Sequence, residues 1–230
     1  MTAWGTLASV SWDTLASAAT ALGTLVLALA TFSVVRSGRR SAVATEVALM
    51  AGIKPLLLPS HMDDPDQKVS FADEHWVHVG GGMAAAEATA DAVYLVVSLR
   101  NVGNGLAILD RWDLTPHDVF DPADAAEFVD RASQRRPRQV AQFRRLSRAL
   151  YIPTGELGFW HGALRDPSEE LFKFASEAVV DRRALTLDLL YSDVQGGQMT
   201  ISRFTLRPVG EDRWLTTIGR HFDVDDRSSR

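Results

Sequence analysis

The sequence predicts a mainly β, α+β fold, in which an N-terminal transmembrane helix precedes a β-sandwich that carries a helical insertion. Three observations predict it. Residues 14–35 contain no charged side chain, and a helix of that length crosses a hydrocarbon core of about 30 Å. Short runs rich in β-branched and aromatic residues follow, separated by turn residues. Strands and helices do not alternate regularly, so an antiparallel sandwich is expected rather than a parallel sheet.

The apolar segment is expected to be an uncleaved membrane anchor. Trp12 precedes it at the depth of an interfacial aromatic belt, and Arg36, Arg39 and Arg40 follow it directly. A secretory signal peptide carries its positive charge before the apolar core, so this order argues against cleavage. The positive-inside rule then predicts a single-pass protein of the cell membrane, with residues 1–13 outside and the C-terminal domain in the cytoplasm. The alternative is a buried helix of a soluble protein.

The helix is expected to continue through residues 36–52, with Gly52 as its stop. Within the span, small residues recur at four-residue spacing (Ala16, Thr20, Thr24 and Ala28). This spacing is typical of a close-packing face and would permit a homo-oligomer through the span. The alternative is simply an alanine-rich helix.

Composition bounds the function classes. The chain is 46% hydrophobic and 23% charged, as in ordinary globular proteins, and its net charge of −5 argues against a protein built for nucleic acid. It contains no cysteine, which excludes disulfides, thiolate metal sites and cysteine nucleophiles. No cofactor is expected.

The β-rich domain is expected to span residues 53–221, with a polar tail over 222–230. The turn that begins at Asn101 supplies residues that tolerate a positive φ, as a tight turn or bulge needs. A short helix is expected to begin near Ser168. Strands are expected at residues 53–59, 76–79, 92–100, 106–114, 184–191, 199–206 and 213–219, with a strand pair within 150–160.

The insertion is expected over residues 121–150 as a helical hairpin. Its second helix should follow Pro137, because apolar residues between 140 and 150 recur at helical spacing. Its arginines would contact anionic lipid headgroups or an acidic protein partner. Pairing with the acidic residues of the first helix is the simpler alternative, and nucleic acid is the weakest reading. The arginines concerned are Arg135, Arg136, Arg138, Arg144, Arg145 and Arg148.

Aromatic and histidine residues define a second candidate site, for a small ligand or a carbohydrate. They are Trp76, His78, Trp112, Trp160 and His161. The alternative is that the tryptophans belong to the core, as they more often do in a β-rich domain.

No catalytic or metal motif is expected. The chain has no G-x-S-x-G sequence, and the spacing of His61, His75 and His78 does not match H-E-x-x-H. Asp188 on a strand and Asp193 in the next turn are better acidic candidates than the remaining carboxylates, although Asp193 most simply caps its turn.

Three segments, VYLVVSLRNVGNGLAILDRW, FWHGALRDP and LLYSDVQGGQMTISRF, resemble a group of actinobacterial single-span membrane proteins. The resemblance covers most of the chain, including the anchor. It implies a membrane helix and a β-rich domain, and it implies no activity, substrate or catalytic residue.

The sequence therefore favours a membrane-anchored, cytoplasmic interaction domain without enzymatic activity, which contacts anionic lipid or an acidic protein partner. The alternative is a membrane-tethered β-sandwich that binds a small ligand or carbohydrate, and the third hypothesis is an enzyme of a type without a recognisable motif.

Overall fold

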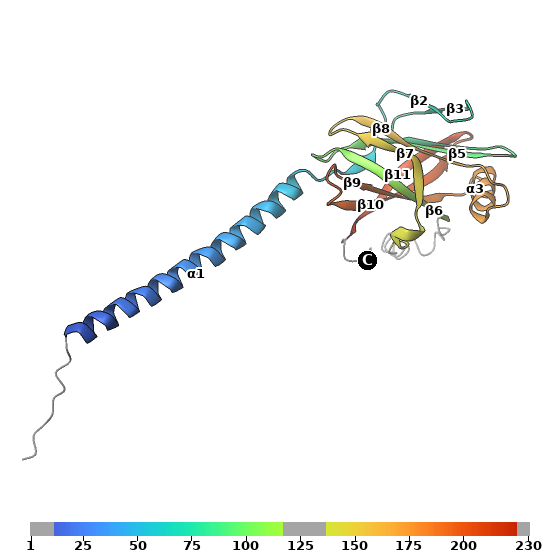
Figure 1. Cartoon of the computed structure of the whole chain (residues 1–230). Helices are drawn as coiled ribbons and strands as arrows, with labels where there is room; N and C mark the ends of the chain where they lie inside the picture. Colours follow the sequence, from blue (N-terminus) through green and yellow to red (C-terminus); the bar gives the residue numbers. More distant parts are fainter. Residues whose placement is uncertain (1–11, 117–136, 225–230) are drawn as a thin grey trace, which may run out of the picture. The chain divides into compact units, whose positions relative to one another are not determined.

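The computed structural model describes residues 12–116 and 137–224 (Figure 1). The chain divides into two compact units, Met1–Ala51 and Gly52–Arg230. Each unit is described by itself below.

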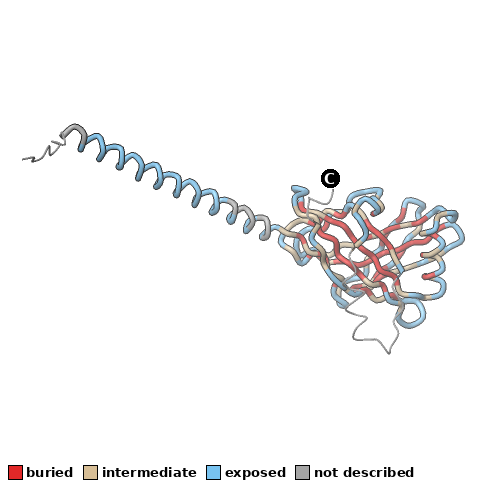
Figure 2. The backbone as a smooth tube through the Cα atoms, turned by 90° about the horizontal axis from the view of Figure 1, so that it is seen from below, coloured by how far each residue is buried: buried red, intermediate tan, exposed pale blue. Residues whose placement is uncertain are grey.

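The described residues of the first unit all belong to one continuous helix, α1, Trp12–Gly52. Its segment Leu15–Ala42 is long and apolar enough to cross a membrane, and none of it is buried within the protein (Figure 2). The hydroxyls of Thr20, Thr24 and Thr31 each donate to the backbone carbonyl four residues earlier, at 2.8–2.9 Å. These bonds satisfy polar groups that would otherwise have no partner in an apolar surrounding.

The second unit is built on one curled antiparallel sheet of nine strands, in the order β1-β5-β4-β11-β10-β9-β6-β7, with β8 on the other side of β5. The mainly β, α+β prediction is confirmed, and all described strands other than β2 and β3 belong to this one sheet. Among the described residues, β7 pairs with β6 alone, and β1 and β8 each pair with β5 alone. The strands are β1 Leu57–Pro59, β4 Met83–Ala88, β5 Val93–Asn101, β6 Ala107–Pro116, β7 Arg144–Ile152, β8 Leu157–Leu164, β9 Leu185–Ser192, β10 Met199–Val209 and β11 Arg213–Val224.

The main core fills the inside of the curl, because alternate residues of each strand point there. Its largest fully buried side chains include Trp160, Tyr191 and Phe204. The helix α3, Glu170–Val180, packs its apolar face, which includes Phe172 and Ala175, against the same core.

A two-stranded hairpin, β2 Gln67–Ser70 and β3 Trp76–Val79, covers part of the other face of the sheet (Figure 1). Its inward side chains, including Val69 and Phe71, form a second apolar cluster with Tyr94 and Val96 of β5. Both faces of β5 are therefore buried, which explains its nearly uninterrupted apolar sequence.

The predicted helix after Pro137 is wrong. The chain there forms one short 3-10 turn, η2 Val140–Gln142, and then the strand β7. The error has a physical cause: Leu146 and Leu150 are four residues apart, which places them on one face of a helix and equally on one face of a strand. Both pack against the main core from the strand. The predicted first helix of the insertion lies outside the described residues.

Three smaller differences also concern strands. β4 was not predicted, because its sequence MAAAEA has little β propensity. β2 was not predicted either, since it lies in a polar stretch. β11 continues through Phe222 to Val224, where a tail was predicted, because Phe222 lies opposite Ile201 of β10 and packs against it.

Candidate functional site

Some of the arginines predicted to contact a partner are bound to other side chains of the domain. Arg135 and Arg136 lie outside the described residues. Arg138 precedes β7 and forms an ion pair with the buried Asp113, with 3.6 Å between Arg138 Nε and Asp113 Oδ2.

Arg144, at the start of β7, is also engaged within the domain. It donates to Glu169 Oε1 at 2.7 Å, and its guanidinium lies 5.8 Å from the ring centre of Trp112. This arginine therefore joins β7 to the segment that leads into α3 and to the core, so its contribution is structural.

Arg145 and Arg148 remain available. Both are exposed on β7, and neither has an ion-pair partner among residues 12–116 and 137–224. Arg145 lies opposite Arg111 of β6. Arg111 in turn donates to Asp110 Oδ2 at 3.1 Å and to the carbonyl of Val140 at 3.3 Å.

One side of the β7 backbone has no paired strand among the described residues. In the part of the chain that the structure describes, β7 pairs with β6 alone and β8 pairs with β5 alone. No ladder joins β7 to β8, although a tight turn connects them. Tyr151, near the end of β7, is 61% exposed. We call Arg111, Arg145, Arg148, Tyr151 and the free backbone edge of β7 the β7 edge surface.

The residues predicted to bind a ligand lie in three separate places. Trp112 and Trp160 are 4% and 0% exposed and meet edge to face in the core, with ring centres 5.2 Å apart. Trp76 and His78 are exposed together on the outer side of β3, where the Lys68 ammonium lies 4.6 Å from the Trp76 ring centre. These residues do not form one site.

His161 lies on the opposite face of β8 from Trp160, beneath the β2–β3 hairpin. Its ring contacts those of Phe71 and Phe159, at centre distances of 5.2 and 5.6 Å. Burial, with a smaller effect of the charge of Arg165, lowers the pKa of His161. Its Nδ1 is buried and has no hydrogen-bond partner among the described residues. The histidine is therefore a neutral packing element under the hairpin.

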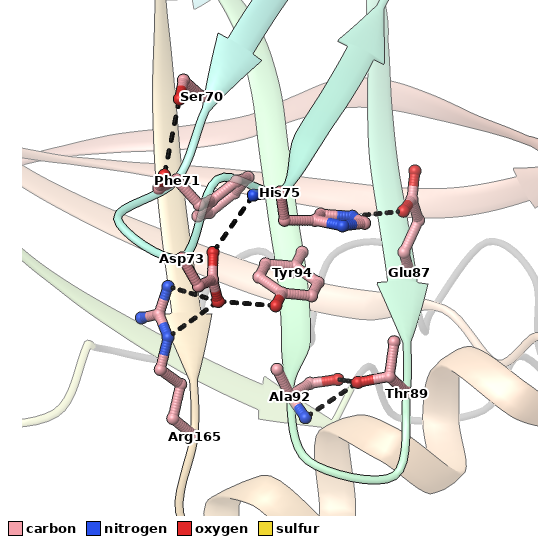
Figure 3. A network of polar contacts seen from close by, with 9 residues as sticks. All are labelled: Ser70, Phe71, Asp73, His75, Glu87, Thr89, Ala92, Tyr94 and Arg165. Atoms are coloured by element: carbon pink, nitrogen blue, oxygen red, sulfur yellow. Dashed lines mark hydrogen bonds and ion pairs between the residues drawn. The ribbon is translucent and has the colours of Figure 1, made fainter.

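A polar network fastens the hairpin to the sheet (Figure 3). Tyr94 of β5 donates its hydroxyl to Asp73 Oδ2 at 2.6 Å, and Arg165 binds the same oxygen at 3.1 Å. The Tyr94 bond lowers the pKa of Asp73 and raises that of Tyr94.

On the other side of Tyr94, the ring of His75 stacks at 4.1 Å, and His75 Nε2 lies 2.8 Å from Glu87 Oε2 of β4 (Figure 3). These contacts tie the loop between β2 and β3 to β4 and β5. The network therefore fastens the hairpin to the sheet.

Asp188, singled out from the sequence, forms the central ion pair of the domain. Arg203 of β10 donates to both of its carboxylate oxygens at 2.7 Å, and both side chains are buried. Asp113 of β6 lies opposite Asp188 in the next ladder. Burial raises the pKa of Asp113, against the positive charge of Arg138, and negative Asp188 adds to the increase. The sequence does not reveal that Asp113, Asp188 and Arg203 are neighbours, because they come from three different strands.

The arrangement that most resembles a catalytic pair is buried. Ser202 Oγ lies 2.7 Å from His221 Nδ1 and 2.8 Å from the Tyr191 hydroxyl, which accepts a hydrogen bond from the backbone of Leu57. Ser202 and Tyr191 are both 0% exposed. A serine at that depth cannot reach a substrate, so these groups stabilise the interior.

Two smaller observations concern metal ligands and the turn at Asp193. Among the described residues, no group of three or more His, Asp or Glu side chains could hold a metal ion. Asp193 caps its turn, since its Oδ1 accepts a hydrogen bond from the backbone of Gly197 at 3.0 Å.

The N-V-G-N-G motif does more than turn the chain. The buried Asn101 side chain accepts hydrogen bonds from the backbone of Leu56 and Gly103, at 3.1 and 3.0 Å. It also donates to the carbonyls of Gly105 and Ile152, at 2.6 and 2.9 Å. All four bonding positions of the amide are filled. Asn101 therefore holds the segment that follows α1 against the sheet.

The predicted membrane-flanking residues belong to α1. Arg36, Arg39 and Arg40 are exposed along it, and Trp12 is its first residue.

Comparison of the chain with protein-family models, with curated proteins and with solved structures found no match.

Proposed function

We propose that this protein is a single-pass membrane protein whose β domain is a non-enzymatic binding module on the cytoplasmic side, with an anionic partner that contacts Arg145 and Arg148. One observation carries the proposal: the membrane-span candidate Leu15–Ala42 is exposed, its residues 15–35 carry no charge, and Arg36, Arg39 and Arg40 follow this uncharged part directly. Burial of such a surface in lipid is strongly favourable. The three arginines favour a cytoplasmic C-terminal domain.

A binding role is favoured because the side chains with catalytic potential are hydrogen-bonded to other residues of the domain. Ser202 and His221 bond to each other inside the domain, and Asp188 is held by Arg203. By contrast, Arg145 and Arg148 are exposed and carry charge that nothing among the described residues neutralises.

The test is protease protection of a C-terminal tag in intact spheroplasts and in inverted membrane vesicles. The proposal expects protection in spheroplasts and cleavage in inverted vesicles. A tag that is cleaved in spheroplasts would refute the cytoplasmic orientation. A protein that is released from membranes by alkaline carbonate would refute the anchor itself.

A matched variant tests the reason for the orientation. Substitution of Arg36, Arg39 and Arg40 by Glu removes the positive flank, so a fraction of the molecules should invert and expose the tag outside. The same substitution at Arg145, Arg148 and Arg207, far along the chain from the span, should leave the orientation unchanged.

The second candidate, a small-ligand or carbohydrate binder, depends on the exposed pair Trp76 and His78. An exposed indole, 51% accessible, offers a flat apolar face next to polar groups, as sugar sites do. A thermal-shift screen of ligands against the full chain and Trp76→Ala would reveal this function through a shift that the variant loses.

A further inference from the structure

We propose that the β7 edge surface binds an acidic, extended segment of a partner protein, which adds to the sheet as a strand beside β7. The inference rests on the proposed function, because it names the chemistry of the anionic partner.

The first argument is the unpaired backbone of β7. β7 pairs with β6 at Arg144, Arg145 and residues 150–152, with a bulge over residues 146–149, and no second strand pairs with it among the described residues. Arg145, Ser147, Arg148 and Ala149 are all exposed. Free N–H and C=O groups in a row form a template on which an extended peptide can pair.

The second argument is charge. Like charges directly opposite each other in a ladder are destabilising, and Arg145 stands opposite Arg111. Asp110 contacts Arg111 but not Arg145. Carboxylates on a peptide strand beside β7 would lie within reach of Arg145 and Arg148 and form charge-assisted hydrogen bonds with them.

The third argument concerns selectivity. Charged side chains on an edge normally discourage pairing with other chains. Arginines discourage basic and apolar strands, yet they favour an acidic strand, so the same residues that prevent aggregation select a partner. Tyr151 adds an exposed aromatic ring near the end of the strand, of the kind that anchors binding interfaces.

A peptide fits this surface better than a lipid headgroup does. Attraction to an anionic leaflet grows with the number of basic residues near it. Arg138 and Arg144 are already engaged by Asp113 and Glu169. What distinguishes β7 is its free backbone, which only a peptide can use.

The experiment uses the purified full chain in detergent micelles and a fluorescein-labelled peptide of alternating Glu and Val. Fluorescence anisotropy measures the affinity, and hydrogen exchange reports on the amides of Arg144–Ile152 with and without peptide. A second peptide of the same charge, with proline at alternate Val positions, cannot form a ladder. The protein variants are Arg145→Glu with Arg148→Glu, and the matched control Arg207→Glu, an exposed arginine on β10.

The proposal expects binding of the Glu-Val peptide with slower exchange in β7. It expects a loss of affinity of about tenfold or more in the double variant, and of less than about twofold in the control. The proline peptide should bind at least about tenfold more weakly. Equal binding of the two peptides, an equal effect of Arg207→Glu, or an absence of binding would each overturn it. Competition by phosphatidylserine vesicles with unchanged exchange in β7 would assign the surface to lipid instead.

These results are independent of membrane orientation. If the peptide does not bind but the tag is protected in spheroplasts, the membrane-anchored cytoplasmic domain is supported and only the peptide partner is refuted.

Discussion

Removal of the Asn101 side chain tests how the segment after α1 is held. Asn101→Ala deletes four hydrogen bonds at once, to Leu56, Gly103, Gly105 and Ile152. Each such bond contributes about 1 kcal/mol net, so the expected loss of unfolding free energy is about 4 kcal/mol. A small domain has only about 5–15 kcal/mol in total, so the variant should be severely destabilised.

The measurement is urea denaturation of the detergent-solubilised full chain, followed by tryptophan fluorescence. Trp112, Trp160 and Trp214 are buried in the β domain and report on its unfolding. The matched control is Asn104→Ala. Asn104 is exposed and contributes its backbone N–H, not its side chain, to the carbonyl of Lys54. The control should change the unfolding free energy by less than about 0.5 kcal/mol.

A second variant separates hydrogen bonding from shape. Asn101→Asp keeps the size of the side chain and its two accepted bonds, but it places an acceptor against the carbonyls of Gly105 and Ile152. It should therefore destabilise the domain at neutral pH nearly as much as Asn101→Ala, and partly recover when acid protonates the new carboxyl. If Asn101→Ala cost less than about 1 kcal/mol, the four bonds would not hold this segment and the reasoning would fail.

Three further predictions follow from the same domain. Asp188→Ala removes the two hydrogen bonds that the buried Arg203 donates to Asp188, and the loss of unfolding free energy by urea denaturation should be about 3–5 kcal/mol; Asp188→Asn should cost less. Gly105→Ala would drive a Cβ into the carbonyl of Ile53, so its melting temperature should fall, whereas an alanine at the exposed Gly197 should have little effect. Burial lowers the pKa of His161 in the folded state. As pH falls, the unfolded chain therefore takes up a proton at this histidine before the folded chain does. The free energy of unfolding should be highest above the ordinary histidine pKa of about 6.5 and decrease as pH falls towards the folded pKa. His161→Phe should flatten that part of the pH–stability profile measured by thermal unfolding.

Much of the fold could be predicted from local patterns. β5, β6, β9 and β10 lie close to their predicted positions, because runs of β-branched and aromatic residues bounded by turn residues identify strands over a few residues. β7 could not be predicted, because the spacing of Leu146 and Leu150 satisfies a helix and a strand alike. The choice between them depends on hydrogen bonds to β6, more than 30 residues earlier in the chain.

The candidate site was predictable only in part. The arginines at 138–148 stand out in the sequence, yet nothing local distinguishes Arg144, which Glu169 engages, from Arg145, which is free. The aromatic residues predicted to bind a ligand also lie in different places: Trp160 is in the core and Trp76 is on the surface. Partners from distant strands decide such differences.

The sequence by itself determined the apolar helix, its basic flank and the mainly β class of the domain, because these properties depend on composition and short-range periodicity. Only the tertiary structure decided that Asp188 is neutralised by Arg203, that Asn101 holds the chain at Leu56, and that β7 has a free edge. Each of these depends on side chains or backbones that are distant in sequence and meet through the strand order and register, which burial and hydrogen bonding set across the whole sheet.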